Sequence, residues 1–112
     1  MASPNIVLVS SDLLLGSRLR AALAGTATVS VVAGSDIPPA EVVFVDLNAD
    51  ADSRIELIAS LRSAGSRRII GFCQHDEREV RIRAMESGAD QVVTNGALQE
   101  AALRLLGVTA RD

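Results

Sequence analysis

The chain has 112 residues, of which 48% are hydrophobic, and its formal net charge at pH 7 is −3. This length suits one domain with one core, and this hydrophobic content excludes an intrinsically disordered chain. The net negative charge would not attract nucleic acid or an anionic membrane surface, so we expect neither as a partner. We therefore expect a single domain over residues 1–112, with its core over about 5–106.

The single cysteine, Cys73, cannot form a disulfide within the chain and suits a reducing compartment. The first residues carry no basic stretch, and the apolar run at residues 6–9 is too short for the core of a signal peptide. No segment approaches the roughly 20 apolar residues of a membrane span. These features predict a cytoplasmic protein. All 11 basic residues are arginine, so no lysine ammonium is available for phosphate chemistry.

In the first half of the chain, continuous apolar runs alternate with a segment whose apolar residues have the spacing of a helix face. Residues 5–9 form a short apolar run, which is typical of a strand buried on both faces. A helix follows from about Leu15 and stops at Gly25, and any of the polar residues 10–12 can cap it. Residues 27–32 predict a second strand, and residues 34–39 predict a loop. Residues 41–46 form another buried run that ends in an acid, Asp46.

The second half continues the alternation. Apolar residues at 57, 58 and 61 mark a helix that Gly65 closes, and residues 68–73 predict a fourth strand. Asp76 and Glu79 have the spacing of a capping box for a third helix, which ends at Gly88. The apolar face of that helix is predicted to comprise Val80, Ala84 and Met85. Residues 91–94 predict a fifth strand.

A last short helix is predicted after the fifth strand. Asn95 can cap this helix, which continues through Leu98, Ala102 and Leu105 and ends at Gly107. The β-α alternation predicts a parallel sheet covered on both faces. In such a sheet function is located at the carboxyl ends of the strands. The residues predicted there are Ser10, Ser11, Asp12, Asp46, Cys73, Gln74, Asn95 and Gly96.

Three segments, Val7–Asp12, Val43–Asn48 and Glu86–Asp90, together resemble the receiver domains of response regulators. Val7–Asp12 resembles the first strand and acidic cluster of that family, and Val43–Asn48 resembles the strand that carries the phospho-accepting aspartate. Glu86–Asp90 is similar to the Gly-Ala-Asp turn before the fifth strand. The resemblance covers roughly residues 5–106. It implies a doubly wound, flavodoxin-like (βα)5 α/β sandwich whose five parallel strands have the order 2-1-3-4-5.

The resemblance also assigns positions around the phosphorylation pocket. Asp46 stands at the acceptor position. Ser10 and Ser11 stand where receivers carry two acids that hold Mg²⁺ with the acceptor, and Asp12 is the next residue. Cys73 replaces the hydroxyl residue that bonds the phosphoryl group.

The remaining pocket positions depart from the family pattern as well. Gln74 replaces a small residue, Asn95 the lysine that pairs with the phosphoryl group, and Gly96 the following proline. Val92 stands at the aromatic switch position. One carboxylate is a weak Mg²⁺ site, so we expect metal binding to be weak or absent and no other cofactor. Phosphoryl transfer depends on charge neutralisation, which this pocket has largely lost.

Each residue also has a structural interpretation. Asp46 can be a strand-end acid that accepts from local backbone amides, Asp12 a helix N-cap, and Cys73 a small buried hydrophobe. The arginines at 78, 81 and 83 are most simply the solvated face of the third helix, or in part a surface for a partner.

The favoured interpretation is a pseudo-receiver, a non-enzymatic module that docks on another signalling protein, such as a kinase or an output protein, without phosphorylation. A homodimer through the third helix, fifth strand and last helix is a further possibility. The alternative is a conventional two-component regulator that a histidine kinase phosphorylates on Asp46. A third interpretation is a module that binds a small ligand in the crevice at the strand ends.

Overall fold

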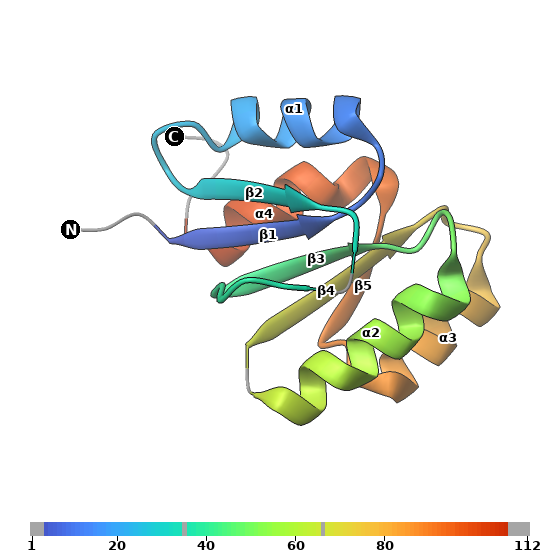
Figure 1. Ribbon diagram of the computed structural model, residues 1–112. Helices are drawn as coiled ribbons and strands as arrows, with labels where there is room; N and C mark the ends of the chain where they lie inside the picture. The colour runs from blue at the N-terminus through green and yellow to red at the C-terminus, as the bar shows by residue number, and fades with distance from the viewer. Residues whose placement is uncertain (1–3, 35, 66, 108–112) are drawn as a thin grey trace.

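Five parallel strands form one sheet in the computed structural model, which describes residues 4–34, 36–65 and 67–107 (Figure 1). The order β2-β1-β3-β4-β5 confirms the predicted order. Each strand pairs in parallel with its neighbours, so all five carboxyl ends lie at one edge of the sheet. The strands are β1 (Asn5–Val9), β2 (Thr28–Val32), β3 (Val42–Asp46), β4 (Arg68–Cys73) and β5 (Gln91–Thr94).

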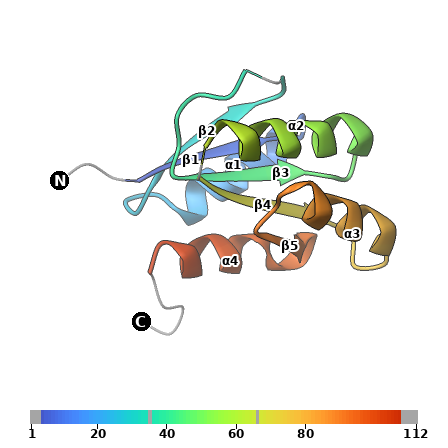
Figure 2. The same ribbon diagram turned by 90° about the horizontal axis from the view of Figure 1, so that it is seen from below.

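Helices cover both faces of this sheet. The helices are α1 (Leu13–Ala22), α2 (Ala51–Ala64), α3 (Arg78–Ser87) and α4 (Leu98–Leu105), with a 3₁₀ turn, η1 (Asn95–Ala97), before α4. Figures 1 and 2 show α1 and α4 on one face and α2 and α3 on the other. Among the described residues, no helix combines the length and the apolarity that crossing a bilayer requires.

The connection from β2 to β3 contains no helix in its described residues, 33–34 and 36–41. This agrees with the loop predicted over residues 34–39, and it means that one β-α unit of the (βα)5 pattern has no helix there. Ile37 and Ala40 of this connection are partly buried against the core on the α2–α3 face. A loop therefore covers the part of this face that a further helix would otherwise cover.

Alternate side chains of the strands build the two halves of the core. Ile6 and Leu8 of β1 point to the face of α1 and α4, whereas Val7 and Val9 point to the face of α2 and α3. Strand side chains alternate in this way because successive Cβ atoms point to opposite faces. The largest buried side chains of the α1–α4 side include Phe44 and Phe72. Burial on both faces explains why these strands are almost continuously apolar.

The predicted cap and apolar face of α3 are partly wrong. The N-cap residue is Glu77, and no side chain caps the helix, so Asp76 and Glu79 form no capping box. Glu79 is the second helical residue, whereas the capping box needs the acid at the third. Val80 and Ala84 face the core as predicted, but Met85 is 45% exposed. A residue next to Ala84 lies about 100° further around a helix, which turns Met85 to the surface.

Candidate functional site

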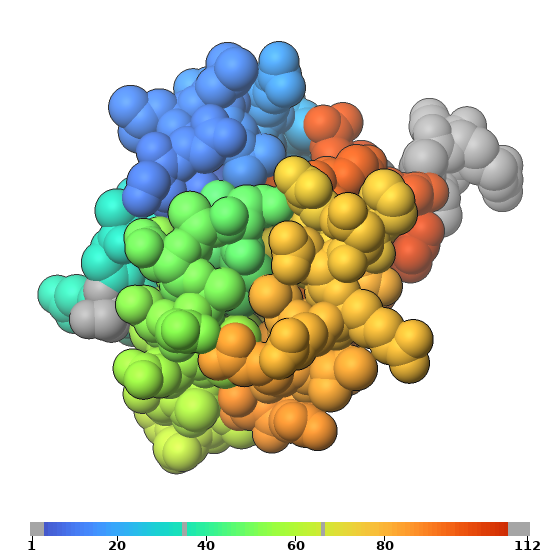
Figure 3. Space-filling view, turned by 90° about the vertical axis from the view of Figure 1, so that its right-hand side faces the viewer, coloured from blue at the N-terminus to red at the C-terminus, as the bar shows by residue number. Residues whose placement is uncertain are grey.

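The candidate site lies at the carboxyl edge of the sheet. Figure 3 looks onto this edge, where the segments that follow β1 (blue), β3 (green) and β4 (yellow) come together. A cavity of about 290 Å³ opens here, which we call the acceptor crevice; it is lined by Asp12, Leu15, Asp46, Asn48, Phe72, Gln74 and Asn95. The structure thus brings together four of the residues singled out in the sequence: Asp12, Asp46, Gln74 and Asn95.

Asp46, at the predicted acceptor position, is only 7% exposed and accepts three hydrogen bonds. Its Oδ2 accepts from the Ser10 hydroxyl at 2.6 Å. Its Oδ1 accepts from the backbone N–H of Asn48 at 2.9 Å and from the Asn48 side-chain amide at 2.7 Å. Charge-assisted hydrogen bonds of this kind are stronger than those between neutral groups. Both carboxylate oxygens are therefore held by neighbours directly after β1 and in the loop after β3.

Asn95, at the lysine position of the family, pairs with Asn48. The side-chain amide of each residue donates to the carbonyl oxygen of the other, and both distances are 2.9 Å. The predicted capping of the last helix by Asn95 is wrong, because Asn95 is the first residue of η1 and no side chain caps η1 or α4. This amide pair joins the loop after β3 to the end of β5 beside the acceptor, and it carries no formal charge.

The two serines that follow β1 have different environments. Ser10 is buried, and its hydroxyl also accepts from the backbone N–H of Asp12 at 3.0 Å. Ser11 is exposed and lines a second cavity instead of the acceptor crevice. Asp12 is the N-cap of α1, as predicted, and its Oδ1 accepts from the backbone N–H of Leu15 at 3.1 Å.

The residues of the acceptor crevice do not fit a Mg²⁺ site. Mg²⁺ needs near-octahedral oxygen ligands, usually with one or two carboxylates free to coordinate it. Of the two carboxylates that line the crevice, Asp12 caps α1 and Asp46 accepts three hydrogen bonds. No group of three or more His, Cys, Asp or Glu side chains suited to a metal ion occurs in the described part of the chain.

The other predicted positions lie around the crevice rather than inside it. Cys73 is fully buried in the core on the α2–α3 face, and burial raises the pKa of its thiol, which the nearby Arg81 guanidinium partly opposes. Val92 packs against the same core. Gly96 lines a smaller cavity of about 170 Å³ beside α1, together with Asn95. Arg81 is partly buried, so it does not belong to a fully solvated helix face.

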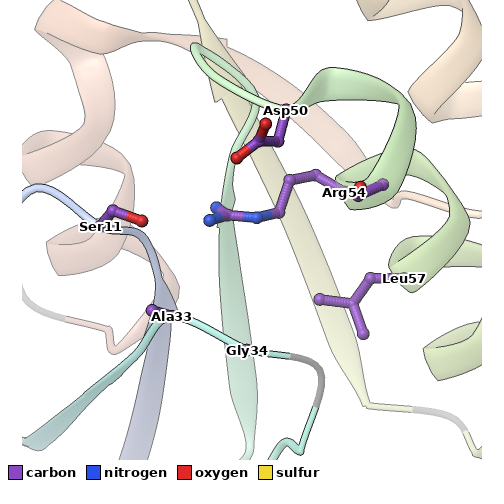
Figure 4. Close-up of a pocket in the computed structure, with 7 residues that line it drawn as sticks. Ser11, Ala33, Gly34, Asp50, Arg54 and Leu57 are labelled. Carbon is purple, nitrogen blue, oxygen red and sulfur yellow. The ribbon is translucent and has the colours of Figure 1, made fainter.

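A buried cation that was not among the predicted site residues lies beneath the strand ends. Arg54 of α2 is only 7% exposed, and its Nη1 donates to the backbone carbonyls of Val9 at 3.0 Å and Asp46 at 3.1 Å. Figure 4 shows its guanidinium directed from α2 toward the loop that carries Ser11. The sequence holds a signal for this burial, because Arg54 precedes Leu57, Ile58 and Leu61 by three, four and seven residues, the spacing of one helix face.

No protein-family model matches the sequence, and no curated protein matches it. Solved structures do match. The receiver domain of TorR, the response regulator of the TMAO respiratory system, is 26% identical, with a TM-score of 0.81 over 93% of this chain and 94% of that one. A CheY-like protein, TadZ, from Pseudomonas aeruginosa PAO1 is 22% identical, with a TM-score of 0.78 over 94% of this chain and 100% of the other.

A response regulator receiver protein from Burkholderia phymatum is also similar, at 20% identity and a TM-score of 0.75 over 96% of this chain and 98% of the other. The sheet order and the position of the crevice define the class of doubly wound α/β proteins whose sites lie at the carboxyl edge. Within that class, the chain has the receiver-type, CheY-like fold that the resemblance implied. The match to the TorR receiver domain, at 26% identity, supports a signalling function of the receiver type.

Proposed function

We propose that this chain is a receiver-like signalling module that acts by protein–protein interaction, with docking that does not depend on phosphorylation of Asp46. One observation carries the proposal. Both carboxylate oxygens of Asp46 are engaged by Ser10 and Asn48, and Asn48 is engaged in turn by Asn95. A phosphoryl group on Asp46 would have to displace these hydrogen bonds.

The charges around Asp46 support the same proposal. Phosphoryl transfer relies on cations that neutralise the charge of the transferred group. At the lysine position stands the neutral Asn95, and Ser10 supplies a hydroxyl instead of a metal-binding carboxylate. Arg54 uses Nη1 on the backbone carbonyl of Asp46, not on its carboxylate. We therefore propose a binding module rather than an enzyme.

The proposed docking face consists of α3, β5 and α4. Ile82 and Met85 of α3 are each 45% exposed, which gives this face two large apolar side chains at i and i+3. Such side chains are suited to the centre of a protein interface. We propose that another signalling protein, or a second copy of the chain, docks here.

A second candidate function is that of a conventional regulator phosphorylated on Asp46. The observation that favours it is the position of Asp46, which ends β3 and lines a crevice of about 290 Å³. In this case Asn48 and Asn95 would have to separate to admit the phosphoryl group. The two functions differ in what they require of the Asp46 carboxylate.

The substitution Asp46→Asn separates these two functions. The partner would be captured from the native cell on the immobilised chain, purified, and its Kd measured for the wild type and for the variant. We expect the two Kd values to agree within about tenfold, or about 1.4 kcal/mol. If the folded variant loses binding by more than that, the conventional regulator is the correct interpretation. Circular dichroism provides the control for folding.

A further inference from the structure

A second cavity, of about 230 Å³, lies beside the switch point of the sheet (Figure 4). Ser11 after β1, Gly34 after β2, and Asp50, Ser53 and Arg54 around the start of α2 contribute to its lining. The cavity shares no lining residue with the acceptor crevice. It lies next to the helix-free connection from β2 to β3, and ligands of doubly wound proteins bind at such a switch point.

Arg54 brings unused donors and an unpaired charge to this cavity. A guanidinium has five N–H donors. Nη1 uses both of its donors on the carbonyls of Val9 and Asp46, and no hydrogen bond of Nε or Nη2 is found among the described residues. The ion pairs found in the described part of the chain do not include Arg54. A buried charge of this kind is costly without a counter-ion. The free Nε–Nη2 edge matches the two oxygens of a carboxylate.

Asp50 supplies the opposite charge to the same cavity. Its side chain does not cap α2, and no ion pair of Asp50 is found within the described residues. Figure 4 shows the Asp50 carboxylate and the Arg54 guanidinium on the same side of the cavity, facing Ser11. A polyanion such as phosphate would meet repulsion from Asp50. A ligand with one carboxylate and one ammonium group would satisfy both side chains.

We propose that this cavity binds a small zwitterion of the α-amino acid class, with its carboxylate on Arg54 and its ammonium group toward Asp50. The hydroxyls of Ser11 and Ser53 line the cavity and provide further donors and acceptors. The size of the cavity, below that of sites for drug-sized ligands, suits a ligand of this class. The proposal concerns a cavity apart from the acceptor crevice and does not depend on whether Asp46 is phosphorylated.

The test is an NMR titration of the ¹⁵N-labelled chain with each of the standard amino acids, and with acetate, ethylamine and inorganic phosphate. We expect at least one amino acid to saturate at about 1 mM or below and to shift the signals of Ser11, Ser53 and the Arg54 Nε–H. Acetate and ethylamine, which each carry one of the two charges, should bind at least about tenfold more weakly.

Matched variants test whether Asp50 binds the ammonium group of the ligand and Arg54 its carboxylate. Asp50 has φ +54°, and asparagine tolerates this left-handed conformation, so Asp50→Asn should fold and lose the preference for the amino acid over acetate. Asp52→Asn, at an exposed position outside the cavity, should keep that preference. Arg54→Lys should weaken amino-acid binding about tenfold, because an ammonium group lacks the planar fork.

Three results would overturn the proposal. The first is that no amino acid saturates at about 1 mM or below. The second is that phosphate or acetate binds as tightly as the best amino acid. The third is that Asp50→Asn leaves the preference unchanged. None of these results depends on partner binding, so they do not affect the proposed function.

Discussion

Ser10 is buried directly after β1, where its hydroxyl makes two hydrogen bonds at once. It donates to Asp46 at 2.6 Å and accepts from the backbone N–H of Asp12 at 3.0 Å. The substitution Ser10→Ala leaves a buried carboxylate oxygen without its donor, which costs about 1–3 kcal/mol. We expect the free energy of unfolding, measured by urea denaturation, to fall by that amount.

Ser11→Ala is the matched control for this change. Ser11 is exposed, and no side-chain hydrogen bond of Ser11 is found among the described residues. Its substitution should change the free energy of unfolding by about 0.5 kcal/mol or less. Equal effects of the two substitutions would show that the bond to Asp46 does not contribute to stability.

The Cys73 thiol should make the free energy of unfolding depend on pH, and a variant can separate its contribution from the others. Burial raises the pKa of its thiol above the ordinary value of 9.0. The unfolded thiol therefore loses its proton first as the pH rises, so the unfolded state binds fewer protons and the stability of the fold decreases. We expect the free energy of unfolding to fall above about pH 9, by up to about 1.4 kcal/mol per pH unit, in urea titrations under reducing conditions.

The composition of the chain allows the contribution of the Cys73 thiol to be recognised. The chain has no lysine and no tyrosine, the side chains that ordinarily titrate in the same pH range as a thiol. The amino terminus is common to all variants and cancels in a comparison. Cys73→Ala should therefore remove the decrease above pH 9, and a decrease that persists in this variant would contradict the assignment.

The end of α3 depends on one glycine. Gly88 has φ +124°, a conformation that side chains with a Cβ rarely adopt, and an added Cβ would lie 2.7 Å from the Cβ of Arg62. Arg62 is itself fixed, since its Nε donates to the Gly88 carbonyl at 2.9 Å and its Nη2 binds Asp90 at 2.6 Å. Gly88→Ala should lower the free energy of unfolding by about 1–3 kcal/mol in urea denaturation.

Gly65→Ala, at the end of α2, is the control on a second helix. Gly65 has φ 176°, which is extended backbone that any residue adopts, and an added Cβ would meet no atom within 4 Å. We expect this variant to be as stable as the wild type or slightly more stable, because alanine restricts the unfolded chain. A loss equal to that of Gly88→Ala would contradict the explanation from backbone conformation.

At the scale of the whole molecule, large exposed apolar side chains lie on two helices. Leu13 and Leu14 begin α1, with 78% and 61% of their surface exposed, and Ile82 and Met85 lie on α3. The proposed docking face includes α3 but not α1. We therefore expect Ile82→Ser to weaken binding of the captured partner by at least about tenfold, measured by calorimetry.

Leu14→Ser is the matched control, because it also replaces one exposed apolar side chain by a small polar one. It should leave the Kd within about threefold of the wild-type value. The reverse result, a loss with Leu14→Ser alone, would place the docking face on α1. If the partner is a second copy of the chain, the radius of gyration in solution should exceed the 13.0 Å of the monomer and return toward it with Ile82→Ser.

The sequence by itself determined the strands and the edge at which the polar residues gather, and its resemblance to receiver domains implied the sheet order. The buried runs at residues 5–9, 41–46 and 68–73 are local patterns, and parallel strands place their carboxyl ends at one edge whatever the details of packing. The capping of α1 by Asp12 was also predictable, since it joins residues three apart. The burial of Arg54 could have been predicted from its spacing to Leu57, Ile58 and Leu61.

Only the tertiary structure decided which side chains of the site form hydrogen bonds with one another. The amide pair joins Asn48 and Asn95, which are 47 residues apart, and Ser10 reaches Asp46 across 36 residues. The local pattern predicted that Asn95 caps the last helix. In the structure its side chain instead donates to the Asn48 amide oxygen, which the pairing of β3, β4 and β5 places beside it. Hydrogen-bond partners at such separations depend on strand register and side-chain orientation, which no window of sequence contains.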